Sequence, residues 1–222
     1  MRAKLKALLL FALSVFCAVG LTGCDLLSSI DADEYAKNTL DAVYRGETAQ
    51  YLQTNENALL EDVAKAHADN VQAELDYFVT DYLGLAVCSA ENEQRLEELY
   101  EKIYRSAKYE VAEAVKAESG YTIEVTVYPI DLFEQAYDEM ASFSEYFFSA
   151  KNLAALGEIT DEAKEDTFLS GILDILLPRT DAIGYNDPET ITLAVVKDEN
   201  GLYTIDRETL GQFDKLLISY DY

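Results

Sequence analysis

Few side chains in this sequence could act as nucleophiles, metal ligands or modification sites. The sequence has three cysteines, Cys17, Cys24 and Cys88, and one histidine, His67, beside 42 aspartates and glutamates. One histidine cannot form a His-Glu-x-x-His zinc site, and no Gly-rich phosphate loop or Gly-x-Ser-x-Gly elbow is present. Paired carboxylates could hydrolyse glycosides. With 42 aspartates and glutamates in the chain, however, such pairs occur by chance and do not identify a site. The sequence therefore predicts no catalytic residue, no metal and no cofactor, and the most informative reactive group is the Cys24 thiol.

The segment before Cys24 has the organisation of an export signal. Three basic residues within the first six positions precede an uncharged apolar run at residues 7–21. This run is shorter than the roughly 20 residues that a membrane-spanning helix needs. A positive start, a short apolar run and small residues before a cut are typical of a secretory signal peptide. We therefore expect cleavage between Gly23 and Cys24, which would remove residues 1–23; the alternative is an uncleaved anchor with a buried cysteine.

The residues around this cut resemble the lipobox of bacterial lipoproteins, with Leu21, Thr22, Gly23 and Cys24 in its four positions. The resemblance implies that the Cys24 thiol receives diacylglycerol and that Cys24 becomes the new N-terminus, with acyl chains such as palmitate. Two acyl chains anchor a protein stably, whereas one binds only marginally. The expected location is the extracytoplasmic face of the cell membrane, with the membrane as a partner through the lipid on Cys24.

The length of the tether and the net charge indicate where the folded part lies and which partners it excludes. Residues 24–30 form a short tether, because the sequence from residue 31, "DADEYAKNTLDAVYRGE", has a helical pattern. The folded part is therefore expected close to the membrane. The net charge is −25, which would repel nucleic acid and anionic lipid headgroups. We expect no nucleic-acid partner.

The remaining thiol and the single imidazole favour structural roles. With Cys17 in the signal and Cys24 lipidated, Cys88 has no cysteine with which to form an intramolecular disulfide. It follows apolar residues in "GLAVCSAEN" and is expected to pack as a small hydrophobe. His67 lies on an apolar helical stripe between Val63 and Val71, which favours a core or boundary position over a ligand.

Three-to-four-residue spacing of apolar side chains predicts helices in the first half of the chain. One helix follows residue 31 and ends near Gly46, and a long one covers residues 57–83 and ends at Gly84. Ser89 is expected to cap the next helix, which carries a stripe from Leu96 to Tyr104. Most of the 16 tyrosines fall on such stripes and are expected in the core.

Alternating apolar residues predict two β-hairpins. In the first, residues 109–117 pair with residues 121–128 around "ESG". In the second, residues 191–195 pair with residues 203–205 around "KDENG". Asp198 and Glu199 are adjacent within this turn, so it lacks the alternating carboxylates of a calcium loop.

A helical insertion is expected between the hairpins, around residues 131–180. Asp131 is predicted to cap its first helix, with Glu134 completing a capping box. A second helix starts near Asp161 and is expected to stop at Pro178. Its segment "FLSGILDILL" is apolar on more than one face, which favours deep burial; the alternative is a partner surface. A last helix carries Leu210, Phe213 and Leu217.

These elements predict an α+β fold in a single extracytoplasmic domain at residues 31–222. An antiparallel sheet of two hairpins would pack with several amphipathic helices, which resembles the cystatin-like and nuclear-transport-factor-like cone folds. The segments "EYAKNTLDAVYRGE" and "ELYEKIYRSAKYEV" also resemble uncharacterised lipoproteins of Gram-positive bacteria with a domain of unknown function. This second resemblance implies no activity and adds no site residue to Cys24.

Two functional hypotheses follow. The first is a membrane-anchored, non-catalytic binding or interaction module of the cell envelope, with an envelope protein as its partner. The alternative is an envelope enzyme that uses acidic residues together with a divalent cation. Binding of calcium or magnesium would raise the melting temperature under the second hypothesis.

Overall fold

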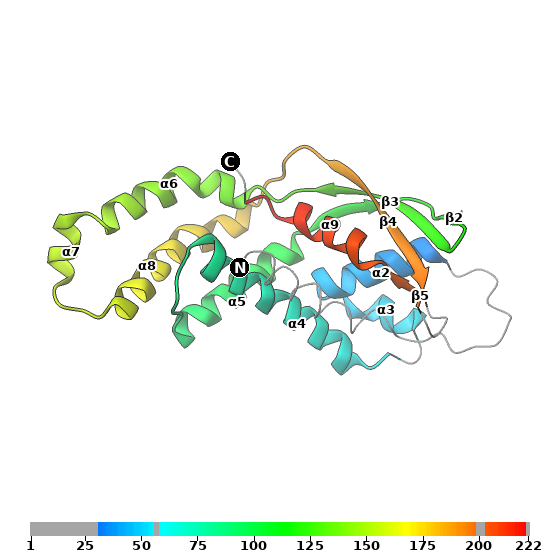
Figure 1. Ribbon diagram of the computed structural model, residues 1–222, viewed down its shortest axis with the longest axis horizontal. Helices are drawn as coiled ribbons and strands as arrows, with labels where there is room; N and C mark the ends of the chain where they lie inside the picture. The colour runs from blue at the N-terminus through cyan, green and yellow to red at the C-terminus, as the bar shows by residue number, and fades with distance from the viewer. Residues whose placement is uncertain (1–30, 56–57, 199–202, 221–222) are drawn as a thin grey trace.

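A curled antiparallel sheet forms one layer of the protein (Figure 1), in a computed structural model that describes residues 31–55, 58–198 and 203–220. Its strands are β1 (Lys108–Val111), β2 (Val115–Ala117), β3 (Gly120–Tyr128), β4 (Glu189–Lys197) and β5 (Tyr203–Ile205). The order across the sheet is β1-β3-β4-β5, and β2 also pairs with β3. Because β4 occupies the other side of β3, β1 and β2 act as one edge strand that is interrupted between them.

The register of β3 against β4 places the alternating apolar residues on one face. Ile123 lies opposite Leu193, and Val125 lies opposite Ile191. The side chains of Ile123, Val125 and Leu193 are fully buried. Both hairpins expected from the alternation are present, β1 and β2 with β3 and β4 with β5, and the α+β class is confirmed.

Two helices cover this buried face. α9 (Arg207–Leu217) packs on β3 and β4, and α2 (Ala32–Tyr44) contacts β1. The Phe213 ring of α9 lies between Tyr44 of α2 and Tyr109 of β1, with ring centroids 5.0 and 5.2 Å away. Leu210, Phe213 and Leu217 are buried, as the amphipathic pattern predicted. This aromatic contact joins α2 and α9 to the edge of the sheet.

Further helices extend this half of the molecule. They are α3 (Thr48–Thr54), α4 (Leu60–Tyr77), the π-helical turn η1 (Phe78–Tyr82) and α5 (Ala90–Arg105). Ser89 caps α5 by accepting a hydrogen bond from the Asn92 amide, as predicted. The long helix expected over residues 57–83 is α4 continued by η1, and Gly84 follows with a φ of 70°.

The helical insertion expected between the hairpins forms an arm that projects from the sheet end (Figure 1). Its helices are α6 (Leu132–Phe147), α7 (Ala150–Leu156), α8 (Asp161–Leu176) and the 3-10 helix η2 (Leu177–Ala182). α8 packs against both α6 and α5, which explains why its apolar residues occupy more than one face. Its buried side chains are those of Phe168, Leu169, Ile172, Leu173, Ile175 and Leu176. The prediction of burial for "FLSGILDILL" is therefore confirmed.

The two helix ends predicted in this arm lie at the expected positions, with one difference at each. Asp131 occupies the N-cap position of α6, but its side chain forms no capping hydrogen bond, so the predicted side-chain cap is wrong. Its carboxylate instead accepts a hydrogen bond from Gln135 Nε2 at 2.8 Å. α8 ends at Leu176 with Leu177 as its C-cap, so it stops just before Pro178, as expected. Pro178 then lies in the first turn of the 3-10 helix η2, where no amide hydrogen is needed. The sequence patterns also missed α3 and α7.

Over the part of the chain that the structure describes, no helix is both long enough and apolar enough to cross a bilayer.

Candidate functional site

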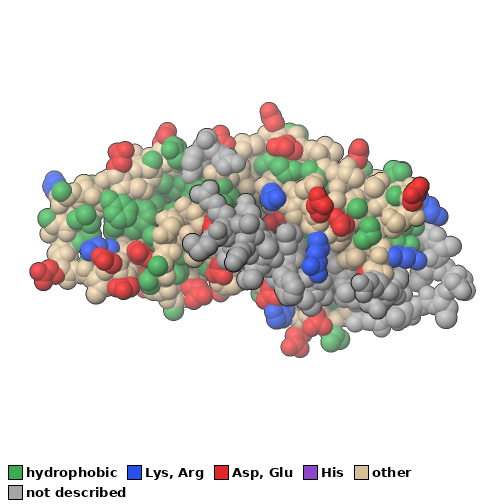
Figure 2. Space-filling model, viewed as in Figure 1, with side chains coloured by type: hydrophobic (Ala, Val, Ile, Leu, Met, Phe, Trp, Pro, Cys, Tyr) green, Lys and Arg blue, Asp and Glu red, His purple; other side chains and the backbone are tan. Residues whose placement is uncertain are grey.

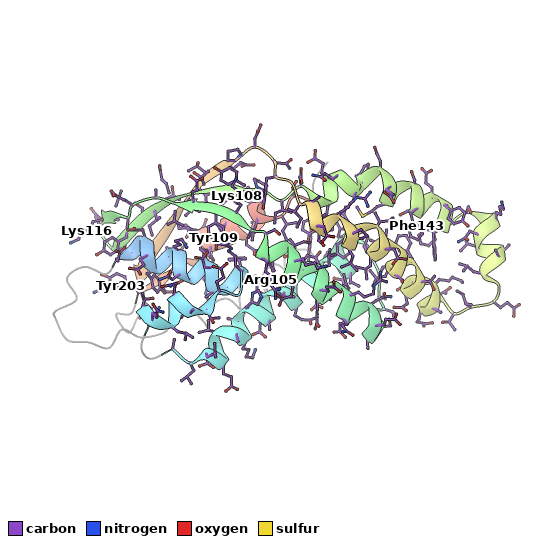
Figure 3. The ribbon with its side chains drawn as sticks, turned by 180° about the vertical axis from the view of Figure 1, so that it is seen from behind. Arg105, Lys108, Tyr109, Lys116, Phe143 and Tyr203 are labelled. Atoms are coloured by element: carbon purple, nitrogen blue, oxygen red, sulfur yellow. The ribbon has the colours of Figure 1, made fainter. Side chains whose placement is uncertain are left out.

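The described part of the chain begins with α2, at the end of the molecule opposite the arm (Figure 1). Near the start of α2, Asp33 accepts a hydrogen bond from the Ala114 amide at 3.2 Å. Tyr35 donates to the carbonyl of Tyr203, also at 3.2 Å. Figure 3 places Lys116 and Tyr203 at one end of the long axis and Phe143, on α6, toward the other. Gly23 and Cys24 lie outside the described residues.

His67 has the structural surroundings that its stripe predicted. Its Nδ1 lies 2.9 Å from the carbonyl oxygen of Val43, and its Nε2 lies 3.2 Å from Glu101 Oε1. The ring also packs against Gly46, where an added Cβ would come within 3.1 Å of Nε2. The imidazole therefore joins the end of α2 to α5, and both of its nitrogens contact protein oxygens.

Cys88 lies in the loop before α5 and packs against the core while remaining partly exposed. Its thiol donates a weak hydrogen bond to the Ser89 carbonyl at 3.5 Å. Burial first, and then the nearby carboxylates of Glu93, Asp166 and Asp76, raises the pKa of the Cys88 thiol to about 11. A nucleophilic cysteine needs a lowered pKa, so this environment favours the structural role.

We expect Cys88 to react slowly with iodoacetamide at neutral pH in the folded protein. The rate should rise with pH and reach half its maximum near the pKa of about 11. In urea the midpoint should fall to the ordinary thiol value of 9.0, because unfolding restores hydration of the thiolate. Mass spectrometry of alkylated protein across pH measures both profiles. A folded-state midpoint at or below that of the unfolded chain would contradict this environment.

A buried polar cluster joins α4, α5 and the tail after α9 where the arm meets the rest of the protein. The Tyr220 hydroxyl, in the tail after α9, donates to Glu74 Oε1 on α4 at 2.7 Å. The Tyr100 hydroxyl on α5 lies 2.8 Å from that of Tyr220. Because Tyr220 gives its one proton to Glu74, Tyr100 donates to Tyr220. We call Glu74, Tyr100 and Tyr220 the tyrosine–glutamate cluster.

Aromatic rings and backbone pairing hold the tail in this position. Tyr220 stacks on Phe133 of α6, with ring centroids 4.5 Å apart, and contacts Tyr77 and Tyr82 at 5.4 and 5.3 Å. Just before the tail ring, Ile130 donates its amide to Leu217 and accepts from Ser219. The tail therefore fastens the first turn of α6 to α4, η1 and α5.

The two tyrosine hydroxyls of the cluster act as hydrogen-bond donors. Burial, together with the neighbouring Glu74 carboxylate, holds the pKa of Tyr100, Tyr104 and Tyr220 well above that of an ordinary tyrosine. These phenols therefore stay protonated at neutral pH and cannot act as general bases there. The cluster is suited to joining elements, and it was missed in the sequence because Glu74 and Tyr220 are far apart along the chain.

A second buried carboxylate has a similar arrangement. Asp41 of α2 accepts a hydrogen bond from the Tyr109 hydroxyl at 2.7 Å and forms ion pairs with Lys37 and Arg45. Burial first, and then Asp41, raises the pKa of Tyr109. Within the described ranges, no group of three or more His, Cys, Asp or Glu side chains is placed to hold a metal ion. Asp41 and Glu74 thus each bind a phenol of their own.

The free end of the arm carries exposed apolar side chains. We call residues 146–156 the arm tip. Tyr146 is 62% exposed and Phe148 is 55% exposed. α7, which follows them, buries none of its side chains. Figure 2 shows hydrophobic side chains gathered on the lobe formed by α6, α7 and α8. The sequence signal for this surface is "YFFSAKNLAAL", which contains Lys151 as its only charge.

Comparison with known proteins bears mainly on the fold. No protein-family model matches the sequence, and no curated protein matches it significantly. Among solved structures, the ycdA protein of Bacillus subtilis, described as a lipoprotein, is similar with a TM-score of 0.55 and 14% sequence identity. The alignment covers 85% of this chain and 56% of that one, so this chain spans little more than half the neighbour's length. The chain thus shares its α+β fold with a Gram-positive protein described as a lipoprotein.

Proposed function

We propose that this protein is a lipoprotein anchored through Cys24 to the extracytoplasmic face of the cell membrane, where it acts as a non-catalytic interaction module. The observation that carries the proposal is the Leu21–Cys24 lipobox, followed at residue 32 by the first helix. The fold shared with a protein described as a lipoprotein supports it. Because residues 25–31 span at most roughly 25 Å, the tether keeps the start of α2 near the lipid.

The buried carboxylates favour the interaction module over an enzyme that uses acidic residues. Asp41 and Glu74 are each engaged by a tyrosine hydroxyl inside the fold. Carboxylates with an acid–base role would need to reach a substrate and to have a pKa matched to the reaction. We therefore assign the two carboxylates to the stability of the fold and the function to its surface.

Replacing Cys24 with serine should move the protein from the detergent phase to the aqueous phase in Triton X-114 partitioning. Serine has no thiol to accept diacylglycerol, and loss of the acyl chains removes about 0.8 kcal/mol of membrane affinity per buried CH₂ group. Immunoblots of both phases measure the effect, and mass spectrometry of the N-terminal peptide tests the added lipid. Cys88→Ser is the matched control and should stay in the detergent phase. A signal-cleaved Cys24→Ser protein that still partitions with detergent would contradict the proposal.

A further inference from the structure

We propose that the arm tip docks an extracytoplasmic protein whose contact surface is apolar and bordered by lysine or arginine. This inference rests on the anchorage through Cys24 proposed above. It is carried by three observations: the exposed aromatic residues of the tip, its place at the end of the molecule far from the tether, and the acidic residues beside it.

The arm tip has the composition of an interface core. Tyr146 and Phe148 expose more than half of their surface. Aromatic side chains dominate the binding energy of interfaces, and charged residues are depleted from interface cores. One face of Phe148 is already supported, because its ring contacts Phe147 and Phe168 with centroids 5.1 and 5.0 Å away. A supported ring loses little conformational entropy on binding.

The position of the tip argues against the membrane as its occupant. The short tether enters α2, whose first turns are hydrogen-bonded to Ala114 and Tyr203. Those contacts lie at the end of the long axis that Figure 3 marks with Lys116 and Tyr203, whereas Phe143 marks the arm. The anchored end thus faces the bilayer, and the arm tip projects into the space where other envelope proteins are found.

The charges beside the tip indicate the partner's chemistry. Glu145 precedes the tip, and Glu158 and Glu162 follow it; all three are exposed. Asp161 is also exposed, but it is ion-paired with Lys164 at 2.8 Å. Figure 2 shows acidic side chains along the outline of this lobe. Anionic lipid and a second copy of this chain would both place negative charge against this border, which is repulsive. A surface bordered by lysine or arginine is attracted instead, so a basic protein is the favoured occupant.

The test is site-specific photo-crosslinking with the full-length, lipidated chain in the membranes of its own host. The photoreactive amino acid p-benzoylphenylalanine replaces Tyr146 or Phe148, which are already aromatic. Val115 is the matched control, since it is 65% exposed and lies on β2 at the anchored end. We expect one discrete heavier species from both tip positions and none of that mass from position 115. The crosslinked peptide, identified by mass spectrometry, should be apolar and flanked by lysine or arginine.

The charge border is tested separately in the same membranes. Combining Glu145→Gln, Glu158→Gln and Glu162→Gln should lower the crosslinking yield roughly threefold, and added salt should lower it similarly. An adduct of twice the chain's mass, an adduct with lipid, no adduct from a membrane-bound chain, or a yield unaffected by the glutamines would each overturn the docking proposal. Failure of the anchorage would instead appear as a full-length chain that does not fractionate with membranes.

Discussion

Replacing Gly120 with alanine should lower the free energy of unfolding by more than about 3 kcal/mol. Gly120 begins β3 with a φ of 151°, and an added Cβ would lie 2.0 Å from the backbone oxygen of Val195. That oxygen belongs to β4, so neither partner can move without disturbing the pairing of β3 with β4. Because β3 also pairs with β1 and β2, the disturbance would spread across the sheet.

Gly157→Ala is the matched control for this prediction. Gly157 has a φ of 73°, but an added Cβ would meet no described atom within 4 Å. It should therefore show only backbone strain, about 1–2 kcal/mol. Urea unfolding followed by circular dichroism measures both variants. Equal losses in the two proteins would show that the close approach to Val195 is not what requires glycine at position 120.

Replacing Tyr220 with alanine should lower the free energy of unfolding by about 3–5 kcal/mol. The change removes a ring stacked on Phe133 together with the hydroxyl that donates to Glu74. Tyr220→Phe keeps the ring and removes only the hydroxyl, and it should have a smaller effect of about 1.5–3 kcal/mol for a hydrogen bond to a charged group. Urea denaturation of the purified proteins separates the two contributions.

The same pair of variants also tests whether the tail fastens the arm. In Tyr220→Ala, hydrogen exchange should become faster in the first turns of α6, because Phe133 loses its stacking partner. Tyr146→Ala, at the exposed arm tip, is the control and should change stability by no more than about 0.5 kcal/mol. Faster exchange confined to residues after α9 would contradict a fastening role for the tyrosine–glutamate cluster.

By holding the start of the arm, the tail after α9 also bears on the proposed function. Phe133 lies in the first turn of α6, and α6 leads to the arm tip. The contacts of Tyr220 with Phe133 and Glu74 therefore set the direction of the arm relative to the half of the protein that starts near the tether. A protein that presents a surface at a fixed distance from the membrane needs such a joint, because a loose arm would lose binding energy when it is ordered.

Much of the local structure could be predicted because its causes are local. The alternation of Ile123, Val125 and Val127 identifies β3 and its buried face over a few residues. Ser89 caps α5 through an amide only three residues away. The stripe in α8 predicts its burial because side-chain spacing alone decides which faces are apolar. The lipobox prediction likewise depends on adjacent residues, and it stays a prediction because Cys24 lies outside the described part of the chain.

Tertiary structure decided the features that join distant parts of the chain. Asp131 occupies the N-cap position of α6 that its residue type predicts, but its amide donates to the distant Gly184 carbonyl, and its carboxylate accepts from Gln135 Nε2 rather than from a helix amide. Tyr220 meets Glu74 across 146 positions, a pairing that no local spacing encodes. In the sequence, the arm tip is only a short apolar stretch. Its exposure depends on how α6, α7 and α8 pack. By itself the sequence determined most of the elements and their buried faces, and it predicted the anchor. The packing of distant elements decided the joint and the exposed surface, because both depend on contacts formed only when remote residues meet.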